Sequence, residues 1–293
     1  MKKKILVLGS GGMLGHIVAL RFKQFPDLFD VIDVSRSNNV TQPSILLDVS
    51  DLNALKILIE SINPTSIINC VGVLNMNAEQ NPADAILLNS YLPHFLEKIT
   101  FNTTCKVVHI STDCVFSGKR GGYLENDFHD ADGFYAKSKS LGELNNNKDL
   151  TIRTSIIGPE IHINGIGLFQ WFSTQEGSIN GYSDVYWTGV TTIELSNAIL
   201  NCLNQDISGM YHLVNNNRIS KYDLLNLFKK VFDNSKVNEI IPSHQYAYDK
   251  SLVNSRKDFS YKVPSYLEMI EEMQKWILDY LPMYPHYINI LKK

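Results

Sequence analysis

The sequence predicts an α/β protein with a doubly wound parallel sheet and a smaller C-terminal domain. Through the first half of the 293 residues, short β-branched or apolar runs alternate with longer amphipathic stretches. Strands that alternate with helices pair in parallel through right-handed crossovers. The runs SIINCV and KVVHI are almost continuously apolar, as strands buried on both faces of a parallel sheet should be.

The expected elements follow one another in a regular order. Strands are predicted at residues 5–8, 31–34, 45–47, 66–71, 106–110, 150–157 and 210–214. Helices are predicted at residues 16–25, 52–62, 83–99 and 134–144. Most of these helices link two strands, as a doubly wound sheet requires.

The second half of the chain loses this alternation. Residues 160–187 are rich in Gly, Trp and Tyr, and residues from about 215 onward hold helices separated by loops such as IIPSHQYAYDKS. We therefore assign residues 1–159 and about 188–214 to the first domain, and about 160–187 and 215–293 to a smaller substrate-binding domain. The smaller domain is expected over the carboxyl ends of the strands, where open α/β sheets bind ligands.

Composition and charge exclude several classes of partner. The net charge of −3 and the pI near 6.2 give no electrostatic reason to expect nucleic acid or an anionic membrane as partner. No run approaches the length of about 18 apolar residues that a membrane span needs. The cysteines are scattered without metal-ligand spacing, a pattern typical of reduced thiols in the cytosol. We expect a cytoplasmic protein without a metal site.

A glycine-rich turn joins the first predicted strand to the first helix. It has the pattern GxxGxxG and consists of Gly9, Ser10, Gly11, Gly12, Met13, Leu14 and Gly15. Glycines allow a tight turn and let the backbone approach a pyrophosphate, and the helix N-terminus supplies oriented N–H groups. A turn of this kind can also be purely structural. Its strand–turn–helix frame predicts a dinucleotide site on a Rossmann-type domain.

The end of the second strand bears on the choice of cofactor. Ser35, Arg36 and Ser37 lie at its tip, whereas Asp33 lies inside it. An arginine flanked by hydroxyls suits the 2′-phosphate of NADPH, because the guanidinium is a planar and permanently charged fork. NADPH is therefore favoured. NADH is the alternative if Arg36 is only a solvated surface residue.

Two later strands are predicted to contribute further cofactor contacts. Asp48 and Val49 follow the third strand, where the adenine is expected. Val71 and Gly72 follow the fourth strand and should lie against the middle of the cofactor.

Tyr135 and Lys139 form the pattern YxxxK in a predicted helix. Residues four apart on a helix share one face and lie about 6 Å apart. The ammonium is therefore expected to lower the pKa of the phenol, so that the tyrosine can exchange a proton near neutral pH. A second copy, Tyr246 and Lys250, lies in the second domain without a comparable context.

The context of the first copy is the run HISTDCVFSG, which follows the fifth strand. It brings Ser111, Thr112 and Asp113 to the carboxyl end of that strand. The glycine turn, Thr112, Tyr135 and Lys139, in this order and spacing, resemble the extended short-chain dehydrogenases/reductases. The runs STDCVFSGKRGGYLENDF, YAKSKSLGEL, RTSIIGPE and GMYHLVNNNRISKYDLL are similar to the branch of dTDP-4-dehydrorhamnose reductases.

The resemblance covers nearly the whole chain and implies an activity. The reaction is hydride transfer from NAD(P)H to C4 of a nucleotide-diphosphate 4-keto-6-deoxy sugar, in deoxysugar and surface-polysaccharide biosynthesis. Tyr135 would protonate the developing alkoxide, and Lys139 would hold the nicotinamide ribose and tune Tyr135. Thr112 would position the carbonyl. Ser111 and Asn89 complete the predicted contacts to the cofactor.

The sequence departs from the branch at three points. Cys114 stands where a tyrosine often follows the Thr-Asp pair, HDADGFY lacks a proline usual before the catalytic tyrosine, and Thr191-Thr192 replaces Pro-Thr. The last two departures bear on loop shape and the first on chemistry. Asp113, Cys114 and Trp187 are the candidate substrate contacts.

Two other functions stay open. Cys114 resembles the cysteine of GDP-fucose synthase-type epimerase/reductases, so a bifunctional epimerase and 4-reductase is one alternative, with His162 as the second proton carrier. The other is a non-catalytic regulatory subunit that binds NADP without turnover. The run 266–281 has apolar residues at helical spacing, which predicts a helix that covers the body or joins a homodimer.

Overall fold

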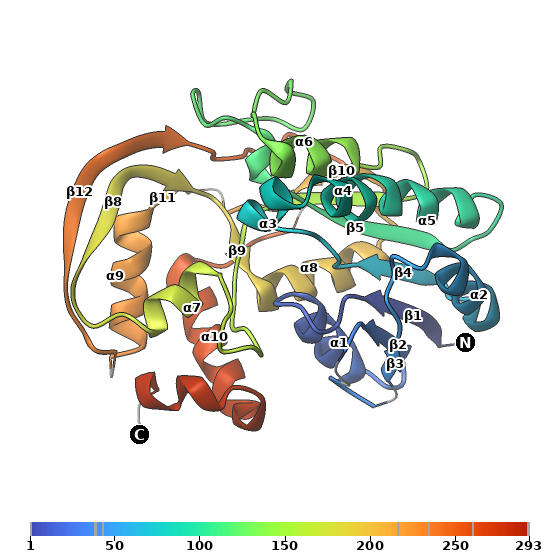
Figure 1. Cartoon of the computed structure of the whole chain (residues 1–293), viewed down its shortest axis with the longest axis horizontal. Coiled ribbons are helices and arrows are strands. Elements are labelled where there is room, and N and C mark those ends of the chain that lie inside the picture. Colours follow the sequence, from blue (N-terminus) through green and yellow to red (C-terminus); the bar gives the residue numbers. More distant parts are fainter. Residues whose placement is uncertain are drawn as a thin grey trace. The chain divides into compact units, whose positions relative to one another are not determined.

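The computed structural model describes residues 2–37, 40–42, 44–215, 217–233, 235–259 and 261–291. It divides into two compact units, which are described separately below (Figure 1). Unit 1 consists of Met1–Ser117, Phe128–Arg153 and Ser196–His212. Unit 2 consists of Gly118–Asp127, Thr154–Leu195 and Leu213–Lys293.

The units differ from the predicted domains mainly in the segment Gly118–Asp127, which the sequence assigned to the first domain. The structure groups it with unit 2 because its backbone pairs with the chain after residue 248. The Asp249 amide donates to the Gly118 carbonyl over 2.7 Å, and the Tyr123 amide donates to the Ser251 carbonyl over 2.9 Å. Residues 154–159 and 188–195 also fall in unit 2.

Seven strands of the described residues form the parallel sheet of unit 1, in the order β10-β6-β5-β4-β1-β2-β3. The predicted doubly wound fold is therefore confirmed. The chain runs from β1 to β3 in one direction and from β4 to β10 in the other, so the order reverses between β1 and β4. Ligands of open α/β sheets bind at such a switch point. The strands are β1 (Lys3–Leu8), β2 (Phe29–Ser35), β3 (Ser44–Leu46), β4 (Ser66–Asn69), β5 (Lys106–Thr112), β6 (Leu150–Thr154) and β10 (Gly209–His212).

Different helices cover the two faces of this sheet. Alternate strand residues such as Leu6 and Val34 pack with Leu55 of α2 and Leu96 of α5 in one core cluster. Helices α1 and α8 lie on the opposite side of the sheet (Figure 1). The helices are α1 (Gly15–Lys23), α2 (Leu52–Ile62), α3 (Asn75–Gln80), α4 (Pro82–Ala85), α5 (Leu92–Thr100), α6 (Phe134–Leu141) and α8 (Thr192–Asn204).

Three predicted elements need correction. The single helix expected at 83–99 is interrupted by a π-helix, Ile86–Tyr91 (η1), between α4 and α5. The helix expected at 134–144 ends at Leu141, where Gly142 packs so closely on the Asn89 carbonyl that a Cβ would lie 1.8 Å from its oxygen. The strand expected at 150–157 divides into β6 and the short strand β7 (Ile156–Ile157), which pairs with β9 (Val190–Thr191) outside the main sheet.

Unit 2 is built on two long parallel strands, β8 (Gly177–Trp187) and β12 (Val237–Asp249), with β11 (Ile219–Ser220) antiparallel to β8. Helix α9 (Lys221–Val231) packs on β8 and β12. Helices α7 (Leu168–Ser173) and α10 (Tyr266–Asp279) and two short 3₁₀ helices, Leu281–Met283 and Pro285–Ile290, complete the unit. Along α10 the apolar residues of the predicted helix are buried, including Met269, Met273 and Ile277. The apolar face of this helix therefore packs within unit 2, and its role in a homodimer stays a prediction.

The prediction of a loop at IIPSHQYAYDKS is wrong, because most of this run forms β12. Pro242 lies within the strand, and a proline normally argues against a strand since it has no amide to donate. It is tolerated here because β12 is an edge strand of its sheet. Most of the strand is exposed, so it also lacks the apolar alternation that would have revealed it.

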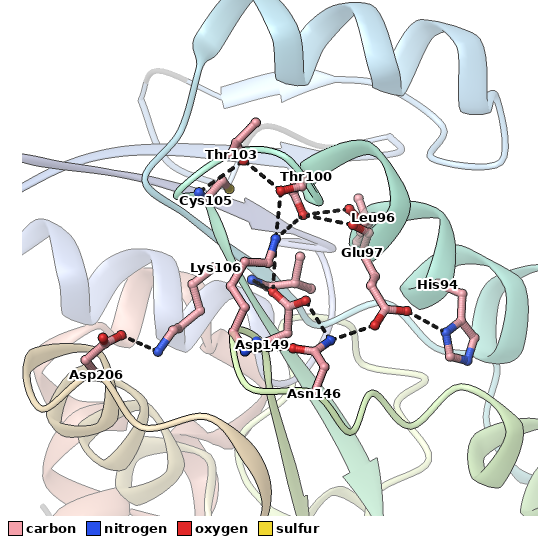
Figure 2. Close-up of polar contacts among 12 residues, drawn as sticks. His94, Leu96, Glu97, Thr100, Thr103, Cys105, Lys106, Asn146, Asp149 and Asp206 are labelled. Carbon is pink, nitrogen blue, oxygen red and sulfur yellow. Dashed lines mark hydrogen bonds and ion pairs between the residues drawn. The ribbon is translucent and has the colours of Figure 1, made fainter.

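A polar network joins the loops at the amino ends of β5, β6 and β10 (Figure 2). The carboxylate of Asp149, which is fully buried, accepts from the Val107 amide over 2.8 Å and from Asn146 Nδ2 over 3.0 Å. Lys148 Nζ lies 3.6 Å from the same carboxylate and donates to the Thr100 carbonyl over 2.7 Å. Asp149 therefore joins the loop before β6 to the amino end of β5, which lies about 40 residues earlier in the sequence.

Replacing Asp149 by alanine should lower the free energy of unfolding by about 3 kcal/mol, because it leaves the buried amide of Val107 without its acceptor. Asp149→Asn keeps an acceptor and should cost less. Urea denaturation of both variants checks this, with Glu60→Ala as the control. Glu60 is an exposed partner of Lys56 on α2 and should change stability by less than about 0.5 kcal/mol. Equal losses in Asp149→Ala and Glu60→Ala would contradict the assigned role.

The described residues hold neither a membrane-spanning helix nor a cluster of metal ligands. No helix among them is long and apolar enough to cross a membrane. Within the same part of the chain, no group of three or more His, Cys, Asp or Glu side chains could hold a metal ion.

Candidate active site

The glycine turn lies between β1 and α1, beside the switch point of the sheet. Gly9 has a φ of +85°, and a Cβ at Gly15 would lie 2.1 Å from the Gly9 carbonyl oxygen, so the fold itself requires both glycines. Gly11 differs, since a Cβ there would meet only the Cβ of Ser35, at an ordinary 3.8 Å. Its missing side chain leaves the backbone open to a ligand. The first turn of α1 holds no acidic residue, so the turn fits the pyrophosphate of a dinucleotide.

The tip of β2 is arranged as the sequence predicted. Arg36 and Ser37 are exposed, and Ser35 is buried beside the glycine turn. Asp33 is fully buried inside the sheet, where Lys23 Nζ lies 3.2 Å from its carboxylate and Ser44 Oγ donates to it over 2.7 Å. Burial raises the pKa of Asp33, but hydrogen bonds from neighbouring hydroxyls and Lys23 outweigh it and lower the pKa overall. Asp33 thus has partners within the protein.

Arg36 stands close to the next predicted contact, Asp48. Hydrogen bonds from Ser50 and, to a lesser degree, the charge of Arg36 lower the pKa of the exposed Asp48 carboxyl. Val49 beside it is buried in the core cluster. Arg36 is thus a solvent-exposed cation at the end of β2.

Asn89 fastens the segment after β4 to α6. It is fully buried in the π-helix, accepts from the Val73 amide over 2.8 Å and donates to the Val73 carbonyl over 2.9 Å. Its Nδ2 also donates to Ser138 Oγ of α6 over 3.0 Å. The side chain therefore acts through its neighbours: it fixes the chain just beyond Val71 and Gly72. π-Helical turns are frequent at functional sites.

Thr112 and Tyr135 meet at the carboxyl end of β5. Thr112 Oγ1 accepts from the Cys114 amide over 3.1 Å and donates to the Asp113 carboxylate over 3.2 Å. The Thr112 side chain is also close enough to Tyr135 to lower the pKa of its phenol. Helix α6 begins directly after Gly133, whose φ of +92° turns the chain into the helix. The structure thus brings Thr112 and Tyr135 together, and their role in catalysis stays a prediction.

Lys139 follows Tyr135 by one helical turn and is 5% exposed. Its Nζ donates to the Ile110 carbonyl of β5 over 2.7 Å. Burial lowers the pKa of Lys139 from 10.5 to about 8, while the charge of Glu143 raises it. The Lys139 amino group is thus held against β5. Near pH 8 a substantial fraction of the protein molecules carry this lysine in its neutral form.

The expected lowering of the phenol pKa is not found in the protein by itself. Burial raises the pKa of Tyr135, the nearby Cys114 raises it further, and the hydrogen bond with Thr112 lowers it in part. The Lys139 ammonium instead donates a hydrogen bond to the Ile110 carbonyl. Tyr135 is therefore protonated at neutral pH, which suits a proton donor.

A buried ion pair lies beside the C-terminal end of α6. Arg153 of β6 is 1% exposed, and its Nε and Nη2 donate to the two carboxylate oxygens of Glu143 over 2.9 and 2.6 Å. Ser111 Oγ donates to Glu143 Oε1 over 2.5 Å. The guanidinium lies 5.1 Å from the ring centroid of Phe116. Bidentate pairs of this kind are rigid as well as strong.

Two histidines complete this network. Arg153 Nη1 lies 2.7 Å from His212 Nε2, and Arg153 Nη2 lies 2.8 Å from His129 Nε2. Because a guanidinium can only donate, both Nε2 atoms must accept, so both imidazoles are neutral and carry their proton on Nδ1. His129 Nδ1 is 2.5 Å from Ser140 Oγ of α6. Burial lowers the pKa of His129, in keeping with a neutral ring.

The remaining candidates are less directly involved. Cys114 is half-buried in the 3₁₀ turn Asp113–Val115. Trp187 is 2% exposed and packs in unit 2 against Tyr266 and Lys221, so its ring belongs to the core of that unit. The second YxxxK is not helical, since Tyr246 lies on β12 with an exposed side chain.

Sequence reasoning missed Glu143, Arg153 and His129. One signal was present: an arginine inside the strand LTIRT is a charge in a buried position, which requires a partner. Glu143 follows Lys139 by four residues, a spacing that would place both on one side of a helix that continued past Leu141. Nothing in the sequence indicated that His129 would reach the same arginine.

Comparisons with known proteins show which family and which fold the chain resembles. The family model described as RmlD substrate binding domain matches residues 2–257. A dTDP-4-keto-6-deoxy-D-glucose reductase from Streptomyces niveus is 24% identical over 76% of this chain and 77% of its own length. A methionine adenosyltransferase 2 subunit beta from Xenopus tropicalis is 25% identical over 76% of this chain and 70% of its own length. The structure of a dTDP-4-dehydrorhamnose reductase from Bacillus anthracis, in complex with NADP, superposes with a TM-score of 0.78 at 22% identity, covering 93% of this chain and 98% of that one.

Proposed function

The chain belongs to the family described as RmlD substrate binding domain, and we propose that it is an NAD(P)H-dependent reductase of sugar nucleotides. It reduces the C4 ketone of a nucleotide-diphosphate 4-keto-6-deoxy sugar, in deoxysugar and surface-polysaccharide biosynthesis. The observation that carries this proposal is the placement of Tyr135 beside Thr112 at the carboxyl end of β5, with Lys139 one helical turn further on. The free cysteines of the chain support a cytoplasmic enzyme, because thiols stay reduced there.

The residues have distinct tasks in this reaction. With its pyrophosphate at the turn Gly9–Gly15, NAD(P)H would supply the hydride from its nicotinamide. The Tyr135 hydroxyl donates the proton that the C4 oxygen takes up, and its raised pKa keeps that proton in place until then. The Thr112 hydroxyl, which lies close to Tyr135, orients the same oxygen. The Lys139 ammonium stabilises the negative charge that develops on the tyrosine oxygen.

The test of the proposal is NADPH oxidation by the purified protein with dTDP- and UDP-4-keto-6-deoxyglucose, followed at 340 nm, a wavelength specific to the reduced nicotinamide. We expect turnover with at least one of the two nucleotides and formation of a 4-hydroxy sugar. Dinucleotide binding without any turnover would contradict the proposal.

Arg36 is proposed to select NADPH over NADH through the 2′-phosphate. Arg36→Ala should raise the Kd of NADPH about 10- to 100-fold, the loss of one charge-assisted hydrogen bond, and leave the Kd of NADH nearly unchanged. Fluorescence titration with both cofactors measures the ratio. Arg21→Ala, near the far end of α1, is the matched control. An equal loss for both cofactors would show that Arg36 does not read the phosphate.

A second candidate function follows from Cys114, whose thiol is near enough to Tyr135 to raise its pKa. A thiol at that place can exchange protons at the carbons beside the ketone, which adds epimerisation to reduction. Incubation with the 4-keto substrate in deuterated water, without NADPH, tests this. Deuterium at C3 or C5 that disappears in Cys114→Ser would establish epimerisation, and no incorporation would eliminate it.

A regulatory subunit is the third candidate, because one relative is named as a subunit of another enzyme. It would bind NADP and leave the keto sugar unchanged. A non-catalytic protein has no need of Thr112, Tyr135 and Lys139 together, which favours the reductase.

A further inference from the structure

Helix α6 and the residues directly after it are fastened to the end of β5 by two polar contacts that follow each other along the chain. Lys139 Nζ donates to the Ile110 carbonyl over 2.7 Å, and the next residue of the strand, Ser111, donates from Oγ to Glu143 over 2.5 Å. Lys139 and Glu143 are four residues apart, and Ile110 and Ser111 are neighbours. The two contacts therefore hold the helix C-terminus in register with the strand.

Glu143 cannot turn away from this position. Both of its carboxylate oxygens are bonded to Arg153, whose guanidinium is itself bonded to His129 and His212. His129 Nε2 also lies 3.5 Å from Glu143 Oε2. Since both imidazoles are neutral, Glu143 and Arg153 carry the formal charges of this cluster among the described residues. Such a bidentate pair holds the carboxylate in one orientation.

The other groups that face Lys139 carry no charge near neutral pH. Burial raises the pKa of the Cys70 thiol to about 12. His109, whose Nε2 is 3.4 Å from Lys139 Nζ, has its pKa held well below the ordinary value by burial and by Lys139. Among the described groups that act on Lys139, Glu143 thus supplies the counter-charge.

We infer that Glu143 is a positioning residue of the reductase: fixed by Arg153, it latches α6 to β5 and supplies the counter-charge that keeps the Lys139 ammonium available to Tyr135. The pair Glu143 and Arg153 thereby acts on the reaction without touching substrate or cofactor. This inference rests on the proposed function, because it assigns a task to Lys139 that only the reductase needs.

The test measures the ionisation of Lys139 directly. In protein labelled with ¹³C at the lysine Cε, Lys139 is assigned by its absence in Lys139→Met and titrated by NMR between pH 6 and 11. Glu143→Gln keeps an oxygen for Ser111 but removes the charge, so its Lys139 midpoint should fall by about one pH unit. The basic limb of the kcat/KM profile for the keto sugar should move down by the same amount.

Glu97→Gln is the matched control. Glu97 is also a partly buried carboxylate of unit 1 with two side-chain partners, His94 and Asn146, but it lies in the amino-end network (Figure 2). Its removal should leave the Lys139 midpoint unchanged. An unmoved midpoint in Glu143→Gln would overturn the inference, even if activity were lost, because the carboxylate would then be only structural.

Glu143→Gln leaves Arg153 as an unpaired buried cation, which can prevent folding. The double variant Glu143→Gln/Arg153→Gln removes both charges and keeps polar groups in the cluster. It should fold and still show the lowered Lys139 midpoint. A wild-type midpoint in the folded double variant would equally overturn the inference. Because the NMR titration does not require turnover, it remains decisive even if the protein reduces neither keto sugar and the proposed function fails.

Discussion

Lys139→Met is expected to lower kcat about 10³-fold and yet to unfold at a higher urea concentration than the wild type at pH 7. The buried ammonium stabilises the charge that develops on Tyr135, so activity depends on it. The same burial lowers its pKa from 10.5 to about 8, which corresponds to a destabilisation of roughly 3 kcal/mol while the lysine is charged. Lys139→Met also removes the hydrogen bond to the Ile110 carbonyl, which reduces the expected gain in stability by about 1 kcal/mol.

The stability difference should depend on pH with a defined sign. Between pH 8 and pH 10.5 the unfolded chain binds a proton at this lysine that the folded protein has released, so wild-type stability rises with pH relative to the variant. The variant is therefore expected to be more stable by about 2 kcal/mol at pH 7 and less stable by about 1 kcal/mol above pH 10.5. Urea denaturation of both proteins at the two pH values measures this. A pH-independent difference would contradict the burial of a charged lysine.

Tyr135→Phe should lower kcat by 10²- to 10⁴-fold, the range expected when a general acid is removed, and change the Kd of NADPH by less than about threefold. The substitution removes one hydroxyl and leaves the aromatic ring in place. Steady-state kinetics and a binding titration on the same preparation separate the two effects.

The chain contains its own control for this experiment. Tyr246→Phe alters the other YxxxK tyrosine, which lies exposed on β12, and should leave kcat unchanged. Comparable losses in both variants would mean that Tyr135 has no special role in the chemistry.

The sequence predicted the parallel sheet well because buried parallel strands are apolar on both faces. Strands such as β1 and β5 therefore stand out as continuous runs, and their order along the chain implies the crossovers. The same reasoning failed for β12, whose residues are mostly exposed and include Pro242. It also missed the π-helix Ile86–Tyr91, because one extra residue per turn leaves no visible trace in an apolar pattern.

The site could be predicted only where local spacing decides proximity. Tyr135 and Lys139 are one helical turn apart, and Thr112 ends a strand, so their grouping follows from secondary structure. Glu143, Arg153 and His129 come from a helix end, a strand and a loop, and only tertiary packing brings them together. Trp187 shows the converse error: an aromatic residue in an unusual segment was a candidate contact, whereas its ring is 2% exposed.

The central claim is that this protein itself transfers hydride to a sugar ketone. The most direct measurement uses NADPH carrying two deuterium atoms at C4 of the nicotinamide, together with dTDP- and UDP-4-keto-6-deoxyglucose. The account predicts a product with one deuterium at C4 of the sugar, and none above background with Tyr135→Phe. Tight binding of the deuterated cofactor with no deuterium in either sugar would contradict it.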